Sequence, residues 1–111
     1  TAWDVYAMAN VQAPTGDPEY WFTVFATSDA TRNQGKYSSE KLDELEKELS
    51  AEFDIEKRAE LAVQMQQTVL DDHAFVFCSF LKMSMISKAN VTGYESHACD
   101  YYQVTADLDI N

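Results

Sequence analysis

Residues 39–70, SEKLDELEKELSAEFDIEKRAELAVQMQQTVL, decide the fold of this chain because they carry two helical patterns separated by a short turn. Leu42, Leu45 and Leu49 recur at helical spacing on an otherwise charged stretch, which predicts an amphipathic helix that begins after Ser38 or Ser39. Asp54 is placed to cap a longer second helix that ends near Leu70. The short turn favours an antiparallel helix pair. The apolar face of the second helix comprises Ala62, Met65 and Val69, widened by Ala59 and Leu61.

On the N-terminal side of this pair, the sequence predicts a strand, a loop and a buried helix. Residues 3–8, WDVYAM, alternate in the manner of a strand. Asp17 can cap the following helix, with Pro18 at its first position, where the missing N–H has no consequence. Residues 19–26, EYWFTVFA, are apolar almost all round, which is typical of a buried helix. The polar residues 28–37 form a loop before the helix pair.

On the C-terminal side, the pattern changes to strands. Residues 74–80 (AFVFCSF) and 82–87 (KMSMIS) are rich in aromatic and β-branched side chains, residues 90–93 form a turn, and residues 103–110 alternate with period two. The order strand, three helices and further strands predicts an α/β fold, with α+β as the alternative. Because the strands are few, we expect an exposed sheet edge that could pair with a second copy, making a homodimeric interaction module an alternative reading.

Charge and composition exclude several classes of partner. The formal net charge is −11, from 19 acidic and 8 basic residues, which argues against nucleic-acid binding and against docking on anionic lipid. The sequence contains no run of about 18 apolar residues and therefore predicts no transmembrane helix. The chain starts at Thr1 without Met, so we expect residues 1–111 to be one piece of a longer protein.

No motif of a catalytic or metal centre is evident. Cys78 and Cys99 lack zinc-site spacing, and two separate buried thiols are expected, with a disulfide as the alternative. GxSxG and HExxH are absent, and three glycines in all leave little room for a phosphate-binding loop. We therefore expect no enzymatic activity and no resident cofactor.

Three blocks, in order, resemble the family 5 extracytoplasmic solute-binding proteins, which serve ABC importers of oligopeptides, dipeptides and nickel. They are residues 3–22 (WDVYAMANVQAPTGDPEYWF), residues 32–77 (RNQGKYSSEKLDELEKELSAEFDIEKRAELAVQMQQTVLDDHAFVF) and residues 87–95 (SKANVTGYE). The second block is similar to the family's Asn and Tyr-Ser loop, followed by an acidic turn and a KRAEL-like helix that leads into a strand. No block is specific alone, but the ordered set spans nearly the whole chain.

The resemblance implies a type II periplasmic-binding-protein-like fold, in which two lobes close on a ligand. Residues 1–111 would form the last part of the C-terminal lobe. The implied partners are a small-molecule solute and, through the parent protein, the membrane permease of the importer. The implied location is extracytoplasmic, with a lipid anchor on the parent protein.

The resemblance leaves the solute open between a nickel complex and a peptide. The peptide-binding branch has an Asp that clamps the α-amino group of the ligand, and the matching position here is Pro14. The nickel branch is closer, through Ala13-Pro14 shortly before Asp17-Pro18, but Glu19 stands where some members have His. We therefore expect nickel or a metal–chelator complex, with an oligopeptide as the alternative.

Five residues are candidates for the site. Tyr6, Tyr20 and Trp21 could pack against a chelator, although aromatic side chains at such spacing are more often part of a core. Arg32 could clamp a ligand carboxylate, although a surface role is the simpler reading. His97, beside Glu95, Cys99 and Asp100, could ligate a metal, with an ordinary loop histidine as the alternative.

Overall fold

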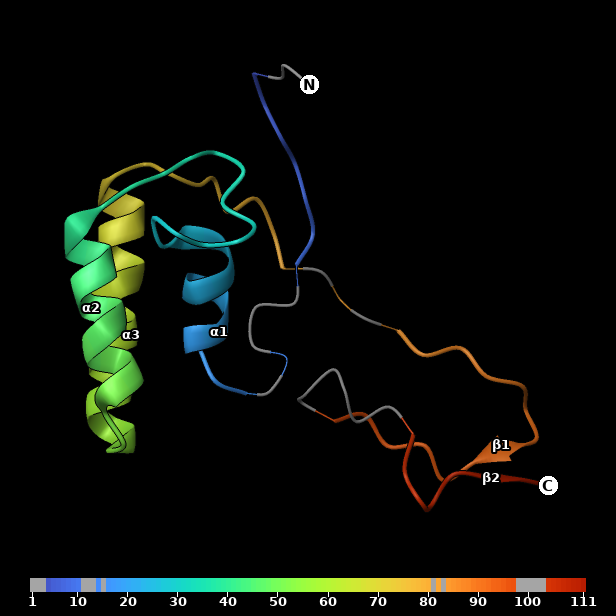
Figure 1. Ribbon diagram of the computed structural model, residues 1–111. Helices are drawn as coiled ribbons and strands as arrows, with labels where there is room; N and C mark the ends of the chain where they lie inside the picture. The colour runs from blue at the N-terminus through green and yellow to red at the C-terminus, as the bar shows by residue number, and fades with distance from the viewer. Residues whose placement is uncertain (1–3, 11–13, 15, 81, 83, 98–103) are drawn as a thin grey trace.

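Three helical segments and a small antiparallel sheet form the part of the chain described by the computed structural model, which covers residues 4–10, 14, 16–80, 82, 84–97 and 104–111 (Figure 1). At this coarse level the predicted mixture of helices and strands is confirmed. The radius of gyration is 17.7 Å, against about 13 Å for a compact chain of this length. The helices are therefore the packed part, and the segments leading from them are extended.

The predicted helix pair is present as α2 (Glu40–Ala51) and α3 (Ile55–Asp71), which pack side by side (Figure 1). Ser39 takes the N-cap position of α2 but makes no side-chain cap hydrogen bond. Asp54 caps α3 as predicted, because its Oδ1 accepts hydrogen bonds from the backbone N–H groups of Glu56 at 3.1 Å and Lys57 at 3.0 Å.

The aromatic helix is also confirmed, with an unusual second half. It begins as α1 (Glu19–Trp21) and continues as the π-helix η1 (Phe22–Ala26), whose wide turn is closed by a 3.0 Å hydrogen bond from Thr27 N–H to Phe22 O. Pro18 is the residue before the first turn, one position earlier than predicted. Asp17 still acts as a cap, because its Oδ1 accepts from the Glu19 N–H at 2.9 Å.

The core lies between η1 and the facing sides of α2 and α3. Leu42, Leu45 and Leu49 of α2 and Ala62, Met65 and Val69 of α3 are buried as predicted, whereas Ala59, predicted to widen the face of α3, is exposed. The aromatic helix contributes the bulkiest side chains. Half-buried residues on the flanks, including Tyr20, Leu61 and Phe75, pack against this cluster. The buried cluster consists of Trp21, Phe22, Phe25, Ala26, Leu42, Leu45, Leu49, Ala62, Met65 and Val69.

The end of α3 is shaped by a Schellman motif. The His73 N–H bonds to Leu70 O at 3.1 Å and the Ala74 N–H to Val69 O at 3.4 Å, while His73 takes the left-handed conformation with φ of 54°. His73 therefore lies directly after the C-cap residue Asp72, two residues beyond the last residue of α3.

The sheet consists of β1 (Val91–Thr92) and β2 (Asp109–Ile110), paired antiparallel with Val91 opposite Ile110. β1 falls where a turn was predicted, and the turn lies one step earlier, at residues 89–90. Of the strand predicted over residues 103–110, only β2 forms ladder pairs among the described residues 104–110.

Three predicted strands are wrong for the residues that the structure describes. Residues 4–8, 74–80, 82 and 84–87 have no ladder partner, and side chains such as Val5 and Ile86 are exposed. Their composition suits a strand, but a strand also needs a neighbour for its backbone groups. The expected burial of Cys78 is wrong too: this cysteine is an exposed free thiol, and Cys99 lies outside the described residues.

Candidate functional site

The helices α1, η1, α2 and α3 together form the helical unit. Its most highly connected polar group is the guanidinium of Arg58, in the first turns of α3. Its Nη2 lies 3.0 Å from Asp17 Oδ1, 2.7 Å from Asp17 Oδ2 and 2.8 Å from Glu19 Oε2. Its Nη1 donates to the backbone oxygens of Leu49 at 2.7 Å and Glu52 at 2.9 Å. One side chain therefore ties together the start of α1, the end of α2 and the start of α3.

The electrostatics of this cluster favour a permanently charged Arg58. The hydrogen bond that Arg58 donates to Glu19, followed by the nearby charge of Asp17, raises the pKa of the Arg58 guanidinium above its ordinary value. Two carboxylates face one cation, so the cluster carries a formal charge of −1. Glu19 is held from its other side by the hydroxyl of Ser50, which donates to Oε1 at 2.7 Å.

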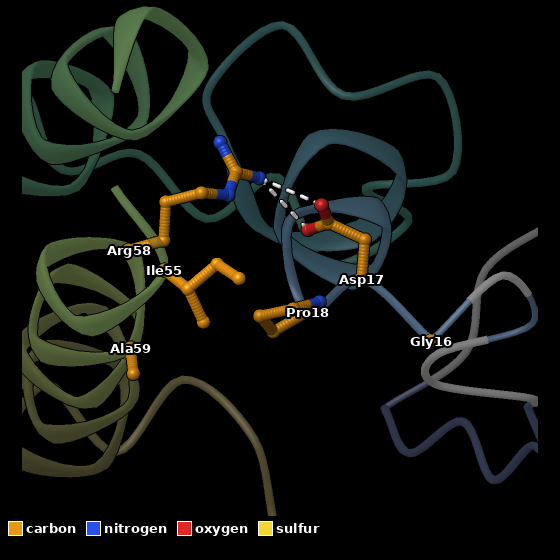
Figure 2. A pocket seen from close by; sticks show the side chains of 6 residues that line it. All are labelled: Gly16, Asp17, Pro18, Ile55, Arg58 and Ala59. Atoms are coloured by element: carbon orange, nitrogen blue, oxygen red, sulfur yellow. Dashed lines mark hydrogen bonds and ion pairs between the residues drawn. The ribbon is translucent and has the colours of Figure 1, made fainter. Parts of the chain in front are cut away.

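An open hollow lies beside the cluster (Figure 2), with a volume of about 400 Å³. Figure 2 shows Arg58 reaching from α3 toward Asp17 across it, while the side chain of Ile55 lies beneath the guanidinium. The Arg58 side chain is only 19% exposed, whereas Asp17 retains 45% exposure. The hollow is lined by Gly16, Asp17, Pro18, Ile55, Arg58 and Ala59.

Both oxygens of Asp17 are already engaged. Oδ1 accepts from the Glu19 N–H and from Arg58, and Oδ2 accepts from Arg58. Because both oxygens already accept hydrogen bonds from within the chain, Asp17 is poorly placed to clamp an ammonium group of a ligand. Asp17 thus accepts from the first turn of α1, as predicted, and it also binds Arg58 through both oxygens.

The loop before α2 is organised by Asn33. Its Nδ2 donates to Thr27 O at 3.1 Å and to Tyr37 O at 2.6 Å, and its Oδ1 accepts from the Tyr37 N–H at 2.9 Å. Tyr37 in turn donates its hydroxyl to Asp72 Oδ2 at 2.5 Å. Burial, and then the hydrogen bond to Asp72, raise the pKa of the Tyr37 phenol. Asn33 and Tyr37 thus fix the loop.

The five candidate residues from the sequence lie in different surroundings, and none lines the hollow beside Arg58. Trp21 is buried in the aromatic core, with its ring centroid 5.2 Å from that of Phe75 and 5.7 Å from that of Phe77. Tyr20 is half-buried beside the same core. Arg32 is exposed, with its guanidinium carbon 5.9 Å from the centre of the Phe25 ring.

Tyr6 and His97 are both exposed. Among the described residues, no group of three or more His, Cys, Asp or Glu side chains is arranged to hold a metal ion. Cys99 and Asp100, which accompany His97 in the sequence, lie outside the described residues. Within the described part of the chain, no helix has the length and apolar character needed to span a membrane.

Sequence reasoning missed Arg58 as the centre of the helical unit. Its partners Asp17 and Glu19 are 41 and 39 residues away, so no local pattern connects them. The available signal was an Arg next to a helix start, near the end of a preceding helix whose last carbonyl groups need donors.

Comparison with known proteins gives no relative: no protein-family model, no curated protein and no solved structure matches this chain.

Proposed function

We propose that this chain is a C-terminal lobe segment of an extracytoplasmic solute-binding protein that delivers its solute to an ABC importer. The proposal rests on the three ordered sequence blocks that resemble the family 5 binding proteins. We also propose that the chain forms one wall of the ligand cleft in a type II periplasmic-binding-protein-like fold with two lobes. A non-enzymatic role and a lipid-anchored parent protein complete it.

The observation that supports the proposal most directly is the contact between the first and second blocks. Asp17 and Glu19 of the first block bind the guanidinium of Arg58 in the second block. An ion pair between these blocks gives a physical reason for the two patterns to occur together in one sequence. It also makes the Gly-Asp-Pro segment a structural joint between the aromatic helix and α3.

For the solute, we propose nickel held through a small chelator, with an oligopeptide as the alternative. Pro14 stands where the peptide-binding branch has its ammonium clamp, and the Asp17 carboxylate is occupied by Arg58 and by the Glu19 N–H. Neither position therefore supplies a free carboxylate for the N-terminus of a peptide. This absence of a clamp is what favours the chelate.

The proposed contacts with the solute are Tyr6, Tyr20, Trp21 and Arg32, and the proposed metal contact is His97. Tyr6, Arg32 and His97 are the strongest candidates for contact with the solute, because they are exposed whereas Trp21 is only 9% exposed. Arg32 offers a planar cation suited to a chelator carboxylate. His97 offers an imidazole, which suits nickel.

Isothermal titration of the untagged chain tests the proposal with three probes: nickel chloride, nickel with two equivalents of histidine, and a tripeptide. We expect saturable heat with the nickel–histidine complex and its loss in His97→Ala. The matched control is His73→Asn, because asparagine tolerates the left-handed backbone of position 73. Saturable binding of the tripeptide without nickel binding selects the peptide alternative, and no saturable binding with any probe contradicts the proposal.

A further inference from the structure

Residues 74–80, AFVFCSF, follow α3, and this segment has two different faces. Phe75 and Phe77 pack their rings against Trp21, at centroid distances of 5.2 and 5.7 Å. The alternate residues point away from this contact: Val76 is 86% exposed, Phe80 is 89% exposed, and Cys78 is exposed. One face of the segment is therefore anchored on the helical unit while the other presents apolar side chains to water.

The backbone of this segment is as uncovered as its outer face. No backbone–backbone hydrogen bond joins residues 75–80 to the rest of the described chain. A run of aromatic and β-branched residues with open N–H and C=O groups is a ready template for pairing with another strand. Within the described chain, the backbone of residues 75–80 and the outward side chains of Val76 and Phe80 therefore lack the partner that a strand requires.

We propose that a second copy of this chain covers the segment, by antiparallel pairing of residues 76–80 with themselves about a two-fold axis at Cys78. In this register Val76 lies opposite Phe80 of the partner, and Phe80 opposite the partner's Val76. An aromatic side chain facing a β-branched one is a favourable cross-strand pair. Cys78 faces its own copy, and the outer face becomes one continuous apolar strip.

Charge supports a second copy as the occupant. Residues 74–80 carry no charged side chain, and no acidic residue occurs from residue 73 to residue 94. The net charge of −11 is therefore borne by other parts of the chain, so two copies can meet at this segment with little local repulsion. The remaining long-range repulsion is screened by salt, and the dimer should strengthen from 50 to 500 mM sodium chloride.

The size of the interface sets the expected affinity. Pairing the two strand backbones and the facing flanks of Val76 and Phe80 removes less surface than the roughly 1,200–2,000 Å² of a standard interface. This area is at the low end for a specific interface, which corresponds to a reversible dimer. We therefore expect monomer and dimer to exchange at micromolar concentrations. The inference is independent of the proposed solute-binding function. Calorimetric titration tests the binding of solute, whereas sedimentation tests the dimer, so either proposal can be contradicted alone.

Sedimentation equilibrium of the whole chain from about 1 to 200 μM tests the association. We expect a monomer–dimer equilibrium that weakens at least tenfold in Phe80→Ser. The matched control is Phe53→Ser, which removes an equally exposed phenylalanine (90%) from the α2–α3 turn and should leave the dimer unchanged. A monomer at every concentration, or equal loss in both variants, overturns the proposal.

Cross-linking tests the register, in a Cys99→Ser background so that Cys78 is the reporter. Residues directly opposite in an antiparallel pair lie about 4.5–5.5 Å apart between Cα atoms, within disulfide reach. Copper phenanthroline should therefore oxidise two Cys78 thiols to an intermolecular disulfide. With Cys78→Ser added, Val76→Cys mixed with Phe80→Cys should cross-link, whereas Val76→Cys alone should not. Equal cross-linking of Val76→Cys alone contradicts the register.

Discussion

The hydroxyl of Tyr37 donates a 2.5 Å hydrogen bond to Oδ2 of Asp72, joining the loop before α2 to the C-terminal end of α3. Removing it in Tyr37→Phe should cost about 1 kcal/mol of unfolding free energy, as for a single hydrogen bond. Urea unfolding at pH 7 measures the loss. Asp72→Asn retains an acceptor at the same place and is expected to cost less.

The same bond gives the chain a pH dependence at the alkaline end. Burial and Asp72 raise the pKa of Tyr37 above its ordinary value of 10.0, so the folded chain holds this proton more tightly than the unfolded chain. The contribution is present in full below pH 10 and is lost as the pH rises through the folded-state pKa. Between pH 9 and 11 the unfolding free energy should fall more steeply for the wild type than for Tyr37→Phe, whereas equal slopes would contradict the linkage.

Leu49 is fully buried between the helices, so Leu49→Ala should destabilise the helical unit by about 2–5 kcal/mol. The cost comes from lost apolar burial and from the cavity left behind. Val63→Ala is the control on α3, since Val63 is 62% exposed and its truncation should stay within about 0.5 kcal/mol. Urea unfolding followed by circular dichroism compares the two variants.

Gly93 is required by the small sheet. A Cβ on Gly93 would lie 1.8 Å from the backbone oxygen of Asp107, and its φ of +77° already disfavours other residues. Gly93→Ala should therefore open the β1–β2 pair, while the helices keep their stability. Amide hydrogen exchange should lose protection at Asn111, whose N–H bonds to Asn90 O at 2.9 Å. Gly35→Ala, which meets no atom within 4 Å, is the matched control and should leave that protection unchanged.

Arg58 joins three helix ends, and a lysine cannot reproduce its fork of donors. Arg58→Lys should therefore lower the urea midpoint clearly, whereas Lys57→Ala should change it little, because the ion pair of the Lys57 ammonium to Glu52 is long, at 3.8 Å. Because Asp17 and Arg58 contact each other directly, the effects of Asp17→Asn and Arg58→Lys should be non-additive. Additive losses in the double mutant would show that the two side chains act separately.

What could be predicted from the sequence is what local spacing determines. The stripe of Leu42, Leu45 and Leu49, and the cap at Asp54, follow from helical periodicity and from the chemistry of the first turn. Each depends on residues within one or two turns of one another. These predictions are confirmed without any knowledge of the rest of the chain.

The strands and the site depend on distant residues. Residues 74–80 have the composition of a strand, but pairing also depends on a neighbour, which the described chain does not supply. Conversely, Val91 pairs with Ile110, although the local pattern there indicated a turn. Arg58 was missed for the same reason, since both of its carboxylate partners lie about 40 residues earlier.

The π-turn of η1 gives this helix a fixed length. A turn closed from Thr27 to Phe22 takes up one residue more than an α-turn, and it carries Phe25 and Ala26 into the core just before the chain enters the loop. Deleting a single residue between Phe22 and Ala26 would close this turn as an α-turn and alter the spacing of Phe22 and Phe25, which are both buried in the core. Natural variants of this chain should accordingly accept insertions and deletions in the loop at residues 28–37 far more readily than within η1.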